Sequence, residues 1–219
     1  MLDFKKVFEK YEALVAEIEK GVHKIKETNP GEFLCQKGCC DCCYAVFDLP
    51  LIESVYLNYC FFKEKESERK DQEEILERAN TADRQVYRIK RNLNKLLTQG
   101  KQTEDEVLSL LSLERIKCPL LNNEALCDLY ENRPVTCRVY GVPTAIHGAG
   151  HTCGKSGFKE GILYPTINLD RINQRLFDLS EELLKEIGAD GEELKARLLP
   201  VSTSLLTDYD EEFFGVNRC

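Results

Sequence analysis

The sequence predicts a mostly α protein, a single helical domain over residues 1–219 with two irregular cysteine-rich loops that form a metal site. Apolar residues recur at helical spacing through most of the chain. Proline and glycine gather around the cysteines instead, and no succession of strand and helix patterns is present. A length of 219 residues suits one domain.

The N-terminal segment predicts an amphipathic helix over about residues 2–28. Asn29-Pro30-Gly31 follows it and ends the pattern. The apolar residues at steps of three and four are Phe4, Val7, Phe8, Tyr11, Leu14, Val15, Ile18, Val22 and Ile25.

The segment between the two cysteine regions predicts three helical stretches. One starts at Leu49-Pro50 and runs through Phe61 or Phe62, with proline near its first turn. Residues 63–99 are highly charged but keep a helical apolar period, which predicts a long solvated helix or a helical hairpin. The capping-box sequence Thr103-Glu104-Asp105-Glu106 starts a helix to about Ile116.

The charges at the start of the 63–99 stretch have two interpretations. Those around residues 63–66 and 71–77 are typical of a solvated helix face. The alternative is that they dock a basic partner.

The cysteine-containing region from Cys118 to about Gly161 predicts mostly irregular structure, with a short helix over Val135–Tyr140. Helices return over about 166–199, first along the apolar face that starts at Leu169 and then near 192–198. An irregular tail is expected to follow. The cysteine-cluster core therefore spans about residues 33–160, flanked by helices on both sides.

Composition narrows the class of protein. With 30 Lys and Arg against 38 Asp and Glu, the formal net charge is −8, which disfavours binding to a phosphate backbone, so no nucleic-acid partner is expected. The sequence has neither the apolar core of a signal peptide nor an apolar run long enough to span a membrane, so no membrane partner is expected either. These features predict a cytoplasmic protein, where clustered thiols bind metal or do redox chemistry more often than they form disulfides.

Nine of the eleven cysteines lie in two short stretches. The first reads Cys35-x3-Cys39-x2-Cys42-Cys43 and leaves Cys40 as an extra thiol. The predicted ligands are Cys35, Cys39, Cys42, Cys43, Cys118, Cys127, Cys137 and Cys153. Eight thiols in two quartets suit two four-thiolate sites or one site that draws on both loops.

The pair Cys42-Cys43 favours a polynuclear site in this reading. Adjacent side chains diverge along most backbone conformations, so that both binding one zinc ion would be strained, whereas two irons of one cluster are easier to reach. The predicted cofactor is one or two iron–sulfur clusters of the [4Fe–4S] type. Zinc, mononuclear iron, and disulfides or reactive thiols remain as alternatives.

The ordered motifs resemble a known family. The first quartet, Cys118-Pro119-Leu120-Leu121, the run from Cys127 to Pro134, and Cys137-Arg138 are similar to the YkgJ-type cysteine-cluster family, a CxxCxxCC zinc- or iron-chelating domain. The similarity covers roughly residues 33–160, and the chain departs from the pattern at Cys40 and in its long charged insertion. It implies a metal-binding domain, often an iron–sulfur protein. The family also includes lysine N-methylases that act on flagellin.

Several residues near the cysteines have two interpretations. Lys37, Lys117, Arg133 and Arg138 would offset thiolate charge and donate to sulfur, although the two arginines also suit ion pairs or caps. Tyr130 and Tyr140 either cover the site or belong to the core. His147 and His151 are either ligands or exposed loop residues. Cys60 is expected to be a small buried thiol, and Cys219 a free or adventitiously oxidised one.

Two enzyme motifs are matched only in part. Cys35-x3-Cys39-x2-Cys42 has the spacing of radical S-adenosylmethionine enzymes, but Asp41 stands where an aromatic residue is usual and no β/α succession follows. The segment ending in Gly154-Lys155-Ser156 is similar to a phosphate-binding loop, but Ala149 replaces its first glycine.

The sequence therefore predicts a metal-binding protein, an iron–sulfur module for electron transfer or cluster transfer with an unidentified protein or redox partner. The alternatives are a metal-dependent enzyme of the lysine N-methylase or oxidoreductase kind and a structural zinc-binding protein. No acid–base pair identifies a reaction, so the question of enzymatic activity stays open.

Overall fold

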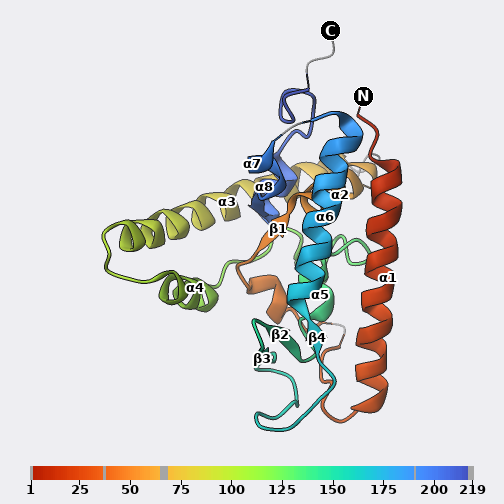
Figure 1. Ribbon diagram of the computed structural model, residues 1–219, viewed down its shortest axis with the longest axis vertical. Helices are drawn as coiled ribbons and strands as arrows, with labels where there is room; N and C mark the ends of the chain where they lie inside the picture. Colours follow the sequence, from red (N-terminus) through yellow and green to blue (C-terminus); the bar gives the residue numbers. More distant parts are fainter. Residues whose placement is uncertain (1, 37, 65–68, 190, 217–219) are drawn as a thin grey trace.

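Three packed helices form the centre of the molecule. The computed structural model describes residues 2–36, 38–64, 69–189 and 191–216. In Figure 1, α1 (Lys5–Thr28) and α6 (Leu169–Ile187) lie side by side, and α2 (Leu51–Glu64) packs against both. The predicted mostly α class is confirmed.

The boundaries of α1 and α6 follow from their sequences. In α1 the apolar stripe is buried, and the backbone N–H of Asn29 donates to the Ile25 carbonyl at 3.0 Å where the helix ends. In α6 the side chain of Asn168 caps the first turn by accepting from the Arg171 N–H. Gly188 ends α6 in the left-handed conformation, with φ of 70°, which glycine adopts without strain.

Helices α3 (Arg69–Thr98) and α4 (Glu104–Leu113) form an arm that projects away from the three central helices (Figure 1). The charged stretch is thus one long helix, and α4 packs back against it. The capping box at Thr103 is present, since its hydroxyl accepts from the Glu106 N–H while the Glu106 carboxylate accepts from the Thr103 N–H. Helix α4 ends before Ile116, whose N–H donates to the Tyr44 carbonyl instead.

Short strands tie the loops to the helices, and the sequence did not predict them. Leu49 and Pro50 belong to β1 rather than to the first turn of α2, and the expected irregular tail contains α8. The remaining elements are η1 (Asp41–Tyr44, a 3-10 turn), β1 (Asp48–Pro50), α5 (Val135–Val139), β2 (Thr144–Ile146), β3 (Ala149–His151), β4 (Ile167–Asn168), α7 (Glu192–Lys195), β5 (Leu198–Pro200) and α8 (Val201–Leu206).

The strands form two small sheets. Strand β1 pairs antiparallel with β5, placing Asp48 opposite Pro200. Strand β2 pairs antiparallel with β3 and parallel with β4. The second sheet places β2 beside β4 and the start of α6, with β3, which precedes Cys153, at the outer edge.

The apolar core lies mainly among α1, α2, α5 and α6. A second buried cluster joins α2, α3 and α8 to the loop that carries Cys118 and Cys127, through residues such as Phe61, Ile75 and Leu129. The cysteine loops therefore rest on packed helices. Among the residues placed in the structure, no helix is long and apolar enough to cross a membrane.

Candidate metal centre

Backbone hydrogen bonds fix the two cysteine loops to one another. The N–H of Cys118 donates to the carbonyl of Cys43 at 2.7 Å, and the N–H of Ile116 donates to the carbonyl of Tyr44 at 3.0 Å. Ala45 and Arg115 form an isolated antiparallel bridge in the same stretch. The first loop thus lies directly against the start of the second.

Seven of the eight predicted ligand thiols line one cavity of about 610 Å³. The first loop and the second loop both contribute: the seven are Cys35, Cys39, Cys42, Cys43, Cys118, Cys127 and Cys137. The eighth thiol, Cys153, lines an adjoining cavity of about 400 Å³ that shares Cys35, Cys39, Cys42 and Cys137 with the first. The two cysteine regions therefore meet in the structure, whereas their spacing left open two separate sites or one site that draws on both loops.

The cysteine thiols that lie close together in space are not the same two sets of four that lie close together in the sequence. Burial raises the pKa of the Cys35 thiol, and the neighbouring thiols Cys39, Cys42 and Cys153 raise it further. Cys153, from the second loop, therefore lies with the beginning of the first loop.

The end of the first loop lies with the rest of the second. Burial raises the pKa of Cys137 well above its usual value, and nearby Cys42, Cys118 and Cys127 add to the effect. Burial also raises the pKa of Cys118 to about 12. As placed, these thiols hold their protons at neutral pH.

Cys42 and Cys43 do not diverge, contrary to the premise of the prediction. Both lie in the 3-10 turn η1, and their Sγ atoms are 4.0 Å apart. A tetrahedral zinc ion with bonds of about 2.3 Å holds two sulfurs about 3.8 Å apart. The adjacency therefore does not by itself favour a polynuclear site.

Cys42 is the more acidic of these two thiols. A hydrogen bond with Cys43 and the Arg133 cation bring the pKa of Cys42 down to about 7, although burial opposes them. The same hydrogen bond and burial raise the pKa of Cys43. Cys42 is therefore the thiol of this pair that ionises first as the pH rises, and Cys43 keeps its proton.

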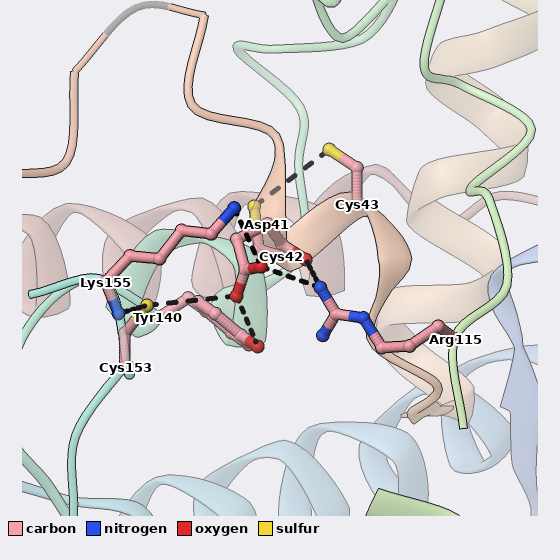
Figure 2. A network of polar contacts seen from close by, with 7 residues as sticks. All are labelled: Asp41, Cys42, Cys43, Arg115, Tyr140, Cys153 and Lys155. Carbon is pink, nitrogen blue, oxygen red and sulfur yellow. Dashed lines mark hydrogen bonds and ion pairs between the residues drawn. The ribbon is translucent and has the colours of Figure 1, made fainter. Parts of the chain in front are cut away.

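Asp41 connects the first loop to three separate segments, as Figure 2 shows. Its Oδ1 accepts from the guanidinium of Arg115 at 2.7 Å and from the Lys155 ammonium at 3.3 Å. Its Oδ2 accepts from the Tyr140 hydroxyl at 3.3 Å, and the Sγ of Cys153 lies 3.9 Å from the same oxygen. Although burial opposes them, Lys155 and Arg115 hold the pKa of Asp41 below its usual value.

These contacts of Asp41 were not predicted from the sequence. Asp41 was noted there only as a departure from an enzyme motif, and Arg115 was not singled out. A carboxylate inside a run of five thiols was the available signal, because such a charge needs cationic partners.

The two predicted arginines have different surroundings. Arg138 also lines the main cavity, but it lies in an ion pair with Glu19 and donates to the carbonyls of Arg133 and Glu131, which fits the ion-pair interpretation. Arg133 lines the main cavity and stacks on the Tyr130 ring, with 3.8 Å from its Cζ to the ring centroid. Its Nε is buried and has no hydrogen-bond partner among the residues described.

Of the other residues singled out near the cysteines, some line a cavity and others do not. Lys117 lines the main cavity, while Lys37 lies outside the described residues. Tyr130 is 57% exposed and covers the cavity instead of joining the core, and Tyr140 lines the second cavity. Cys40 lines neither cavity, although it is half-buried.

The histidines and the two outlying cysteines lie elsewhere. His147 and His151 are exposed and line neither cavity, and His147 pairs with Asp170 at 3.5 Å. Cys60 is buried as expected, and its Sγ accepts from the Asn132 amide at 3.1 Å. Cys219 lies outside the described residues.

One glycine is required for this packing. A Cβ at Gly141, which follows α5, would lie 2.8 Å from the Cβ of Cys35. Any side chain here would displace Cys35 from the wall that the two cavities share.

The thiols line the cavities without closing around a single point. Within the described ranges, no group of three or more Cys, His, Asp or Glu side chains is close enough to hold one metal ion, and the cysteines that line the two cavities are free thiols. The predicted metal site is therefore not formed in this arrangement, and only the shared thiol lining is shown.

No family model, curated protein or solved structure matches the chain.

Proposed function

We propose that the protein binds one or two iron–sulfur clusters of the [4Fe–4S] type in the thiol-lined cavities. It would act as an electron-transfer or cluster-transfer module for a protein partner. The observation that carries this proposal is the meeting of seven thiols from two distant segments around one cavity of about 610 Å³. Clustered sulfur donors are the ligands that iron–sulfur clusters use.

The residues around the cavities fit such a group. Eight thiols exceed the four that one tetrahedral metal ion takes. The buried Nε of Arg133 supplies an unused donor beside them, and Arg133 and Lys117 place positive charge where thiolates would gather. A bound cluster would supply one-electron chemistry, while the protein supplies the thiolates and the compensating charge.

The spatial groups indicate which residues would hold each cluster. Cys35, Cys39 and Cys153 form one group, which Cys42 would complete, although Cys42 also neighbours Cys118, Cys127 and Cys137. Cys43, Cys118, Cys127 and Cys137 form the other. Binding would draw the sulfurs inward and release their protons, because metals take thiolates.

The proposal extends to family and location. The motif order over residues 33–160 supports membership of the YkgJ-type cysteine-cluster family. A reducing cytoplasm would keep the free thiols available to metal.

Anaerobic purification tests the cofactor directly. The full chain is isolated without air, and iron, acid-labile sulfide and zinc are measured together with the visible spectrum. Iron and sulfide in equal amounts, together with a coloured protein that absorbs visible light, support the proposal. A colourless protein with stoichiometric zinc and no sulfide would overturn it.

Paired substitutions test the assignment of ligands. Cys153→Ser and Cys35→Ser belong to one proposed group, so the double variant should lose no more iron than either single variant. Cys153→Ser combined with Cys118→Ser spans the two groups and should lose the iron of both. Cys60→Ser, at a buried thiol away from the cavities, is the matched control. Equal losses in the two double variants would contradict the grouping.

Two alternatives are each favoured by a specific observation. The 4.0 Å separation of the Cys42 and Cys43 sulfurs suits a structural zinc ion shared by both. The main cavity also has an apolar wall that includes Val46, Val86 and Ile116, which suits a substrate of a metal-dependent enzyme. The metal analysis separates the first alternative from the proposal, and turnover assays on a metal-loaded sample address the second.

A further inference from the structure

The outer face of α3 carries a stripe of positive charge in a chain whose net charge is −8. Arg84, Arg88, Arg91 and Lys95 follow one another at steps of four, three and four residues, and all four are exposed. At 3.6 residues per turn they fall within an arc of about 60° and extend over about 16 Å. The stripe is thus a narrow band along one side of the arm.

The opposite side of the same helix is buried. Ala82, Val86 and Leu93 are each at most 9% exposed and face the body of the protein and α4. The stripe therefore points away from everything that α3 packs against.

Nothing in the described part of the chain neutralises the stripe. Residues 84–101 contain six cations and no carboxylate. Among the residues described, Lys90 forms an ion pair, with Asp48, whereas no ion pair involves Arg84, Arg88, Arg91 or Lys95. Aligned cations without counter-charges raise the local potential, and an anionic partner relieves that repulsion.

The charge also changes sign along α3. Glu73 and Glu77 lie on the same outer face, about three and two turns before Arg84. The exposed glutamates in the first half of α3 fit the expectation that the charged stretch is a solvated helix face. The second half of α3 carries the opposite charge.

An aromatic side chain beside the stripe indicates the class of partner. Tyr87 is 64% exposed and lies three residues after Arg84 and four before Arg91, so it borders the stripe. Arginine and tyrosine are both enriched in protein interfaces.

The acidic first turn of α4 argues against a long polyanion. Glu104, Asp105 and Glu106 lie near the end of the arm. A nucleic-acid strand or an anionic membrane extends its charge past the stripe and would meet these carboxylates. A folded partner presents a bounded acidic patch and avoids them.

We propose that the outer face of α3 docks an acidic protein surface, a patch of carboxylates flanked by apolar side chains. This docking is independent of any metal in the cysteine cavities, so the two proposals succeed or fail separately.

The test measures binding to a defined probe. A fluorescein-labelled acidic helical peptide of about 20 residues, with glutamate and leucine on one face, is titrated with the full chain at 20 to 200 mM salt. A single-stranded oligonucleotide of similar charge and phosphatidylserine vesicles are titrated in parallel. We expect the peptide to bind most tightly, with an affinity that falls as salt rises.

Matched charge reversals locate the surface. The triple variant Arg84→Glu, Arg88→Glu and Arg91→Glu should weaken peptide binding at least tenfold. The control Lys5→Glu, Lys20→Glu and Lys24→Glu changes the net charge equally on α1 and should alter binding less than twofold.

Circular dichroism and metal content verify that each variant is folded and loaded as the parent is. The proposal is overturned if the peptide does not bind at 20 mM salt, or if both triple variants lose affinity equally. It is also overturned if the oligonucleotide or the vesicles bind more tightly than the peptide, or if sedimentation shows that the stripe pairs copies of this chain instead.

Discussion

Glu53 is a carboxylate buried in the main core, 2% exposed, where α1, α2 and α5 meet. Its Oε1 accepts from the Tyr11 hydroxyl and from the Val135 N–H, each at 2.8 Å. Burial raises the pKa of Glu53 above its ordinary value of 4.5 more than these hydrogen bonds lower it. The folded protein therefore resists ionisation of this group, and the unfolded chain does not.

The sign of the resulting pH effect follows from linkage. Above pH 4.5 the unfolded chain gives up the proton while the folded state still holds it, so this group costs stability as the pH rises. Glu53→Gln keeps an acceptor oxygen and cannot ionise. As the pH rises above 4.5, the parent should therefore lose stability relative to the Glu53→Gln variant. The difference in unfolding free energy should change by up to about 1.4 kcal/mol per pH unit. It should level off once the pH passes the pKa of Glu53 in the folded state.

Urea unfolding of both proteins from pH 5 to 8 measures this difference. Glu9→Gln, at an exposed position of α1, is the control and should give a flat difference. A parent that gains stability relative to Glu53→Gln as the pH rises would contradict the argument.

Arg133 offers the second prediction for a single residue. Its buried Nε lacks a partner among the described residues, and its charge lowers the pKa of Cys42. Arg133→Met keeps most of the volume and removes both the donor and the charge. Metal bound at the cavity should be held about 10-fold to 100-fold more weakly.

Competition with a chelator measures the loss of metal from this variant. Arg175→Met removes an exposed arginine that pairs with Glu17 on α1, far from the thiols in sequence, and should leave metal retention unchanged. Equal retention in the parent and in Arg133→Met would show that this guanidinium does not support the site.

At the scale of elements, Asp41 ties η1 to the segment that carries Cys153 and Lys155. Asp41→Ala removes the acceptor shared by Arg115, Lys155 and Tyr140. The Arg115 and Lys155 side chains are largely exposed, so solvent screens both ion pairs and the loss of stability should be small. We expect amides 153–156 to exchange with solvent about fivefold faster, as measured by hydrogen exchange. The control Glu17→Ala should leave the exchange of amides 153–156 unchanged. Unchanged exchange in Asp41→Ala as well would show that the contacts of Asp41 do not hold this segment.

The long helices were predictable, and the short elements were not. The apolar stripe of α1, the glycine that ends α6 and the capping box of α4 are local signals, and each gave the correct element. Strands β1 to β5 have only two or three residues, too few for an alternating pattern. They exist because the chain pairs backbone groups across long separations, as Asp48 does with Pro200.

The cysteine site was predictable in part for a related reason. Close spacing brought Cys35 to Cys43 together, and the second run of thiols indicated a partner loop. The transfer of Cys153 to the group of Cys35 could not be read from spacing, because it depends on β2 and β3 turning that segment back. The 4.0 Å approach of Cys42 and Cys43 depends on the 3-10 turn.

At the scale of the whole molecule, the main core does not depend on the cavities. It is built from apolar side chains of α1, α2, α5 and α6, whereas most of the cavity cysteines lie in loops and in η1, with Cys137 alone among them in α5. Removing bound metal from the purified protein with a chelator should therefore keep the helical circular dichroism signal nearly intact. The stability should drop by about 3 kcal/mol if the metal was present at 100 times its dissociation constant.

Hydrogen exchange checks where that stability is lost. The amide of Cys118, bonded to the Cys43 carbonyl, should exchange faster after metal removal, while amides of α1 and α6 should change little. Collapse of the helical signal on chelation would show that the core relies on the metal.

The meeting of Cys153 with Cys35 also sets a time scale during synthesis of the chain. The two residues are separated by about 120 positions, which a ribosome adds in roughly 6 to 24 s at ordinary elongation rates. Throughout this interval the first loop has emerged without the thiols that complete its group. Any metal captured then is held by an unfinished set of ligands, so correct loading belongs to the period after residue 153 has left the ribosome.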